Sequence, residues 1–188
     1  MFQGFRLCGL ALAAAAIPAC GGGNDGGSSS QVDASFELAA DFQLVDKNPK
    51  SKSHDKSVSP RDYMGLVPAF YFTHANCCYC RSQFDFLDQI QRELLSENKH
   101  TKIRLLGINA VGFENDVSGM VAGRKLPLLQ DTSEQNVWGR WIATCRDAMI
   151  LNSENIHVDT YNLTQHDLAN PTFYAELKAR LKSAAGEP

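Results

Sequence analysis

A run of apolar and aromatic residues at 66–73, LVPAFYFT, is followed four positions later by the first of three clustered cysteines. A continuous apolar run of this kind is typical of a strand that is buried on both faces of a sheet. From Cys77 onward, apolar residues recur every three to four positions, which predicts an amphipathic helix of about five turns. The cysteines therefore lie where a buried strand gives way to a helix.

Strands and helices are also predicted on either side of this junction. Further strands are expected at 42–45, 103–110 and 126–129, and a hairpin at 148–151 and 156–161. One helix is predicted through Val137, Trp138 and Trp141, with Asp131, Thr132 or Ser133 as its N-cap. A last helix is predicted from Pro171, with Asn170 as its N-cap. This order predicts an α/β domain with a central mixed sheet flanked by helices, and the two tryptophans are expected to serve as packing.

Length and charge exclude several classes of protein. The chain has 188 residues, 44% of them hydrophobic, which is enough for one well-packed domain and hardly for two. It carries 18 basic and 21 acidic residues, so it has no electrostatic footprint for nucleic acid or for an anionic membrane surface. We expect a monomer that does not bind nucleic acid.

The N-terminal residues are predicted to be a targeting signal. The apolar run 7–17 follows Arg6 and is too short to span a bilayer. It ends in Ile-Pro-Ala-Cys, which resembles the lipobox of bacterial lipoproteins, in which the cysteine is lipidated and becomes the first mature residue. We therefore expect a signal peptide at 1–19 and a lipid on Cys20; the alternative is an ordinary secretory peptide that leaves Cys20 as a stray thiol.

A flexible tether is predicted after the anchor. Residues 20–34 are rich in Gly and Ser, a composition that cannot bury apolar surface, and the folded domain is expected at 35–188. Positions 21 and 22 carry no Asp, so the inner-membrane retention signal is absent. We expect a domain held at the cell envelope by the lipid on Cys20, facing the periplasm from the outer membrane, where disulfides persist.

Backbone geometry selects one pair among the clustered cysteines. Adjacent Cα atoms are about 3.8 Å apart, below the usual disulfide range of about 4.4–6.8 Å, which disfavours a bridge between Cys77 and Cys78. Residues two apart on a helix point in different directions, which disfavours Cys78 with Cys80. Residues three apart share a face, so Cys77 and Cys80 form the natural dithiol.

The position of this pair predicts how it reacts. A helix N-terminus stabilises a thiolate, so we expect a lowered pKa for Cys77, which would be the attacking thiol. Cys80, one turn further, is expected to be more buried and to resolve the mixed disulfide. His74 is a candidate modulator that could stabilise the thiolate when protonated, or it is merely a solvated loop residue.

Other uses of clustered cysteines remain open. A closed zinc site would need a second ligand pair, which the chain lacks. Three soft thiols, Cys77, Cys78 and Cys80, together with His74 could hold Cu(I). A purely structural Cys77–Cys80 disulfide would close a very small loop and stabilise little. A redox-active dithiol that needs no cofactor is the leading interpretation.

The order of these motifs resembles the thioredoxin superfamily, specifically its exported redoxin-type members and the N-terminal domain of selenoprotein P. The resemblance spans about 42–181 and rests on the segments FQLVD, VPAFYF, ANCCYC, LPLLQ and VW, in that order. It implies a three-layer thioredoxin-like fold and a thiol-disulfide oxidoreductase, with protein disulfides or dithiols as substrates and a separate redox partner. Cys77 would attack a substrate disulfide and Cys80 would release the product.

The resemblance also implies a substrate-binding element. Pro127 is similar to the cis-proline that faces the active-site cysteines in this family, and the residue before it, Leu126, would pair with extended substrate. The alternative is a trans proline that opens an edge strand.

Several positions depart from the family pattern. Thioredoxin's Trp before the first cysteine is Asn76 here, its intervening Gly-Pro is Cys78-Tyr79, and its buried Asp corresponds to Tyr71. Cys78 either packs or competes as a second attacking thiol. Cys145 is interpreted as a buried single cysteine, with a distant third redox partner as the alternative.

Two rival functions use the same cysteines. A copper chaperone of the Sco type would combine them with a histidine such as His157 or His166, but its cysteines are normally spaced C-x-x-x-C, which this chain lacks. A thiol peroxidase would need Thr or Ser three residues before its cysteine. That position is His74, so the peroxidase pattern is absent.

Overall fold

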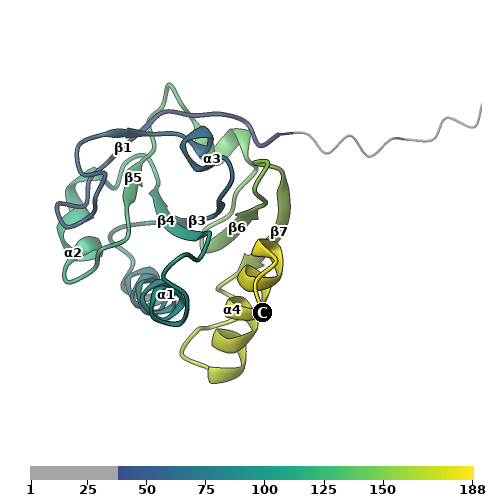
Figure 1. Ribbon diagram of the computed structural model, residues 1–188. Coiled ribbons are helices and arrows are strands. Elements are labelled where there is room, and N and C mark those ends of the chain that lie inside the picture. Colours follow the sequence, from purple (N-terminus) through teal and green to yellow (C-terminus); the bar gives the residue numbers. More distant parts are fainter. Residues whose placement is uncertain (1–37) are drawn as a thin grey trace, which may run out of the picture. The chain divides into compact units, whose positions relative to one another are not determined.

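The computed structural model describes residues 38–188 (Figure 1). The predicted signal peptide, the lipidation site Cys20 and the tether lie outside the described residues. In the described part of the chain, seven strands form one mixed sheet in the order β2-β1-β5-β4-β3-β6-β7. The strands are β1 (Leu44–Asp46), β2 (Ser57–Val58), β3 (Val67–Thr73), β4 (Ile103–Asn109), β5 (Leu128–Gln130), β6 (Asp147–Leu151) and β7 (His157–Asn162).

Four α-helices and two short 3-10 helices accompany the sheet. They are η1 (Pro60–Tyr63), α1 (Cys78–Glu97), η2 (Glu114–Asp116), α2 (Val117–Val121), α3 (Val137–Arg140) and α4 (Pro171–Ala185). None of the helices among residues 38–188 is both long and apolar enough to cross a membrane.

Strand direction decides which loops meet. β3, β4 and β5 run parallel to one another, whereas β6 pairs antiparallel with β3 on its other side. The segments after β3, β4 and β5 and the segment before β6 therefore all emerge at the same edge of the sheet. The cysteine cluster follows β3, so it lies at this edge.

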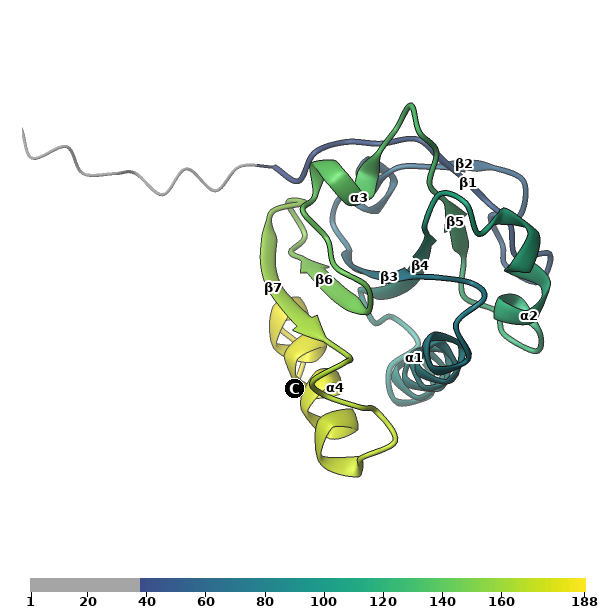
Figure 2. The ribbon, with the colours of Figure 1, turned by 180° about the vertical axis from the view of Figure 1, so that it is seen from behind.

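Helices cover both faces of the sheet. In Figures 1 and 2, α1 and α4 lie together on one face, and α3 lies on the other. The core under α1 and α4 includes Phe84, Leu87 and Leu177, while the opposite core includes Phe70, Phe72 and Val137. Alternate β3 residues enter opposite cores, which accounts for the unbroken apolar run in the sequence. The predicted three-layer α/β architecture is confirmed.

The long helix begins and ends close to where periodicity predicts. α1 has 20 residues, and its buried apolar positions Phe84, Leu87, Ile90 and Leu94 form the stripe that faces the sheet. Asn170 caps α4 as predicted, because its side chain accepts the Thr172 N–H at 2.9 Å.

Other boundaries differ from the prediction. The first strand begins at Leu44 rather than Phe42, and β5 begins at Leu128 rather than Leu126. The helix containing Trp138 is a single turn, and its N-cap is Asn136 rather than Asp131, Thr132 or Ser133. The Asp131 side chain still accepts the N–H groups of Val137 and Trp138 at 3.1 and 3.0 Å. β2 and α2 were not predicted, because two- and five-residue elements leave no measurable periodicity.

Candidate active site

The Cys77–Cys80 pair has the geometry expected of a dithiol at a helix start. Cys77 is the N-cap of α1, and its Sγ atom accepts the Cys80 N–H at 3.2 Å. Cys77 is half-buried, Cys80 is fully buried and Cys78 is exposed. All four cysteines among the described residues are free thiols.

Cys145 joins this pair, although the sequence interpretation favoured a buried single cysteine and gave a redox partner only as the alternative. Its Sγ atom lies 3.8 Å from the Cys80 Sγ atom and 3.8 Å from Nδ1 of His74. Cys145 is half-buried rather than enclosed in the core. It enters the site because β6, which begins two residues later, runs antiparallel to β3 and starts at the edge where β3 ends.

His74 is an ordered member of the site and not a solvated loop residue. Its imidazole stacks between Phe113, at a centroid distance of 4.4 Å, and the Trp138 indole, at 5.1 Å. Burial, and then the nearby Arg146 charge, lower the pKa of His74 below its usual value. The histidine is therefore neutral near pH 7, and the stacking holds its Nδ1 atom beside Cys145.

Buried polar contacts fix the loop that carries His74 and Cys77. The Ala75 N–H donates to Oδ1 of Asn109 at 2.9 Å, and the Arg81 side chain donates to the Ala75 carbonyl at 2.8 Å. The same Asn109 side chain donates to the Phe113 carbonyl at 3.0 Å. The loops after β3 and β4 are thus tied together beneath the histidine.

The thiols differ in acidity, and not as the sequence predicted. Burial raises the pKa of Cys77, and the Cys80 N–H offsets this only in part, so the expected lowered pKa is not found there. The pKa of Cys145 is instead lowered to about 7, chiefly by its hydrogen bond with Cys80, with Arg146 adding a favourable charge. The pKa of Cys80 is raised well above its usual value by the same hydrogen bond and by burial.

Arg146 holds the segment that carries Cys145. Its backbone has a φ of 74°, in the left-handed region that non-glycine residues rarely adopt. The Arg146 N–H donates to the Phe72 carbonyl at 2.8 Å, and its carbonyl accepts the Leu163 N–H at 2.9 Å. Its guanidinium lies 4.9 Å from the centre of the Tyr79 ring. The position of Cys145 is therefore determined by contacts to β3 and to the segment after β7.

Tyr71, which the sequence resemblance matches to thioredoxin's buried Asp, is a neutral group beside Cys80. It is almost fully buried, and its hydroxyl donates to the Cys80 carbonyl at 3.4 Å. Burial raises the pKa of Tyr71 well above its usual value, so the phenol stays protonated. It cannot act as a proton acceptor as a carboxylate would.

Leu126 and Pro127 do not lie beside the cysteines. The Leu126 N–H donates to Oδ1 of Asp88 at 3.3 Å, and its carbonyl accepts from the Asn48 side chain at 2.7 Å. Asp88 lies eleven positions after Cys77 on α1, about 16 Å along the helix axis at 1.5 Å per residue. Main-chain groups that are used inside the domain cannot pair with a substrate, and the residue that faces the dithiol is Cys145.

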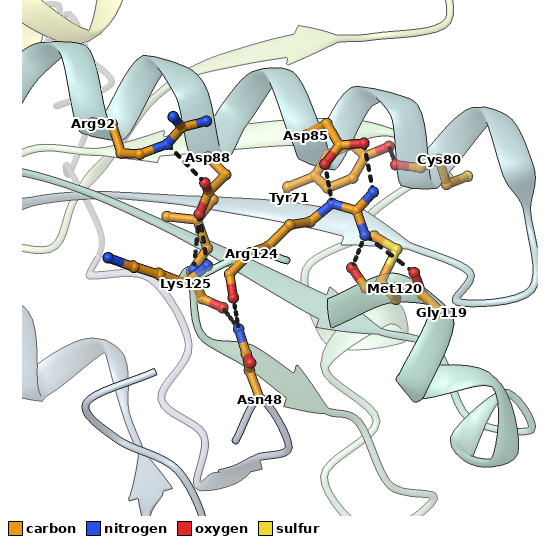
Figure 3. A network of polar contacts seen from close by, with 11 residues as sticks. Asn48, Tyr71, Cys80, Asp85, Asp88, Arg92, Gly119, Met120, Arg124 and Lys125 are labelled. Atoms are coloured by element: carbon orange, nitrogen blue, oxygen red, sulfur yellow. Dashed lines mark hydrogen bonds and ion pairs between the residues drawn. The ribbon is translucent and has the colours of Figure 1, made fainter. Parts of the chain in front are cut away.

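Figure 3 shows how the segment before β5 is attached to α1. The Arg124 guanidinium forms two hydrogen bonds with the Asp85 carboxylate and also donates to the Met120 carbonyl. The next acid along the helix, Asp88, accepts the Lys125 N–H at 2.8 Å. This network fixes the α2–β5 connection as part of the scaffold.

The residues proposed as copper ligands do not form a metal site in the described part of the chain. Residues 38–188 contain no group of three or more His, Cys, Asp or Glu side chains arranged to hold a metal ion. His157 opens β7 opposite Leu151, at the far end of β6 from Cys145, and His166 stacks on Tyr161 at 4.3 Å. The histidine at the site is His74.

The chain resembles known proteins in its fold and not in its sequence. No protein-family model and no curated protein sequence matches the chain. The structure is similar to a candidate protein disulfide isomerase from Bacteroides thetaiotaomicron, with a TM-score of 0.61, 20% identity, and coverage of 81% of this chain and 90% of that chain. The chain has a thioredoxin-like fold.

Two further structures share this fold. A thioredoxin-family thiol:disulfide interchange protein from Chlorobium tepidum has a TM-score of 0.60, 17% identity, and coverage of 79% of this chain and 96% of that chain. Arabidopsis thaliana ScoI with copper bound has a TM-score of 0.60, 15% identity, and coverage of 78% and 99%. The thioredoxin-like fold thus occurs with both thiol-disulfide and copper chemistry, and the site residues must decide between them.

Proposed function

We propose that the protein is a thiol-disulfide oxidoreductase that uses Cys77 and Cys80 as its redox-active pair. The observation that carries the proposal is the placement of Cys77 at the N-cap of α1, half-exposed, with the fully buried Cys80 one turn behind it. An outer thiol that a substrate can reach and an inner thiol that it cannot reach are the arrangement that two-step exchange requires. Several of the similar structures carry thiol-disulfide names, which agrees with the proposal.

The exchange proceeds through one mixed disulfide. The Cys77 thiolate attacks a substrate disulfide, a Cys77–substrate bond forms, and the substrate's other sulfur leaves as a thiolate that takes up a proton. Cys80 then attacks Cys77, the Cys77–Cys80 bond forms, and the reduced substrate is released. The protein is oxidised by two electrons and the substrate is reduced by two, and the reverse sequence oxidises a dithiol substrate.

Trapping the mixed disulfide tests this function. In the Cys80→Ser variant the second step is blocked, so proteins joined to Cys77 are expected to accumulate and to be released by dithiothreitol. The Cys77→Ser variant is the matched control and should trap no partner. The proposal is contradicted if the Cys80→Ser protein captures no partner in its own cellular compartment. It is also contradicted if the Cys77→Ser control captures as much protein as the Cys80→Ser variant.

The proposal extends to location. We propose that the domain is exported and anchored through a lipid on Cys20, because the Ile-Pro-Ala-Cys segment follows a short apolar run and precedes a Gly- and Ser-rich stretch. An envelope location facing the periplasm would supply the oxidising surroundings in which disulfide chemistry persists.

A further inference from the structure

The buried Cys80 has two sulfur neighbours, and both are accessible to solvent. Cys77 lies one helical turn before it, and Cys145 lies 3.8 Å away, measured between Sγ atoms. Cys80 itself has no exposed surface, so it can exchange only with sulfurs that the fold brings to it. Cys77 and Cys145 are each half-buried and so can meet a second molecule.

We propose that Cys145 is a third redox thiol that takes over the disulfide from Cys77, so that the bond passes from Cys77–Cys80 to Cys80–Cys145. This inference rests on the proposed function of the Cys77–Cys80 pair and adds a second disulfide state to it. A sulfur-to-sulfur distance of 3.8 Å must shorten to about 2.05 Å for a bond. Side-chain rotation supplies movement on this scale.

The step balances without a further reactant. The Cys145 thiolate attacks Cys80 Sγ in the Cys77–Cys80 disulfide, the Cys80–Cys145 bond forms, and the Cys77–Cys80 bond breaks. Cys77 leaves as a thiolate and is protonated by water. The protein keeps one disulfide throughout, and Cys77 becomes free for the next substrate while Cys145 carries the disulfide that the redox partner must reduce.

The surroundings of Cys145 suit an attacking thiol. His74, held between Phe113 and Trp138, places Nδ1 at 3.8 Å from the Cys145 sulfur, and the Arg146 guanidinium adds positive charge nearby. The hydrogen bond with the Cys80 thiol is the chief cause of the lowered pKa of Cys145 in the reduced protein, and it is lost once Cys80 is in a disulfide. The Arg146 charge and the hydrogen bond from the His74 backbone also favour the thiolate, and neither depends on Cys80 being a thiol. A cysteine that served only as packing would need none of these contacts.

Disulfide mapping of the full chain tests the proposal. Trypsin places Cys77, Cys78 and Cys80 together in residues 62–81 and Cys145 alone in residues 141–146, so a Cys80–Cys145 bond joins two peptides. After equilibration in glutathione buffers and acid quenching, the wild type should yield a reversible fraction of this joined product. The Cys77→Ser variant should yield it as the main disulfide, and Cys145→Ser should abolish it while retaining the Cys77–Cys80 bond.

The outcomes separate the two proposals. A Cys77→Ser protein whose Cys80 and Cys145 stay reduced in buffers that oxidise the wild-type Cys77–Cys80 pair overturns the third-thiol proposal and leaves the oxidoreductase function intact. A joined product without any Cys77–Cys80 disulfide overturns the proposed function instead. The Cys78→Ser variant is the control for disulfide shuffling. If this variant lost the joined product, the bond to Cys145 would come from Cys78 and not from Cys80, and the proposed transfer from Cys77 would be overturned.

Discussion

The Sγ atom of Cys145 lies 3.8 Å from that of Cys80, although 65 positions separate the two residues in the chain. Because of this contact, the site contains three adjoining thiols, with the buried Cys80 between Cys77 and Cys145, and not an isolated pair. Cys145, and not the Pro127 segment, faces the dithiol, because Leu126 is hydrogen-bonded to Asn48 and to Asp88, and Asp88 lies about three turns along α1 from Cys77.

The first prediction concerns the acidity of Cys145. Because its pKa is lowered to about 7, its alkylation by iodoacetamide in the reduced protein should rise about tenfold per pH unit below pH 7 and level off above it. Peptide mass spectrometry of residues 141–146 measures this rate. In Cys80→Ala the hydrogen-bond partner is lost, so the midpoint should move to higher pH. A midpoint that stays near pH 9 in the wild type contradicts the assignment.

The second prediction separates the two contributions of His74. His74→Ala removes both stacked contacts and should lower the free energy of unfolding by about 1–3 kcal/mol, at about 0.5–1.5 kcal/mol for each pair. His74→Phe keeps a ring between Phe113 and Trp138 and should restore most of that stability while shifting the Cys145 alkylation midpoint. Denaturant unfolding and alkylation measure the two effects. Equal stability of the two variants would contradict the stacking role.

The third prediction tests the scaffold role of the Leu126 segment. Asp88→Ala leaves the Lys125 and Leu126 N–H groups without their acceptor and should cost about 2 kcal/mol or more of folding free energy. Asp88→Asn keeps one acceptor oxygen and should cost less. The Cys77–Cys80 redox couple and the exchange rate with a disulfide substrate should remain those of the wild type. If a folded Asp88→Ala protein selectively lost its exchange activity, the Leu126 segment would have to be assigned a role in substrate binding.

The fourth prediction concerns the anchor. Cells fed a labelled fatty acid should incorporate the label into the wild-type protein, which should fractionate with membranes. Cys20→Ser should carry no label and should be released from the membrane fraction. Label that persists in Cys20→Ser, or an unlabelled wild type, would favour an ordinary secretory peptide.

Local spacing accounts for the part of the site that could be predicted. Cys77 and Cys80 share a helix face, and the apolar run before them and the stripe after them are both visible in the sequence, so the junction and the dithiol follow directly. The α/β layers followed from the order of elements in the same way.

Cys145 and His74 could not be placed by such reasoning. Cys145 reaches the dithiol only because β6 is antiparallel to β3, and strand direction is a property of the whole sheet. The stacking of His74 needs one ring from the loop after β4 and another from α3. The pKa of Cys77 was expected to fall from the helix terminus alone, whereas burial outweighs that effect. Tertiary contacts decide these features.

The most direct measurement is a redox titration of the purified, metal-free full chain in glutathione buffers, read by alkylation and peptide mapping. The account predicts a reversible two-electron couple when the buffer is changed from reducing to oxidising and back. Cys80 loses and regains its thiol together with Cys77, or with Cys145 in the fraction that has transferred the disulfide. Cysteines that remain thiols over the whole range, with stoichiometric Cu(I) uptake in a parallel sample, would contradict it and favour a copper-binding protein.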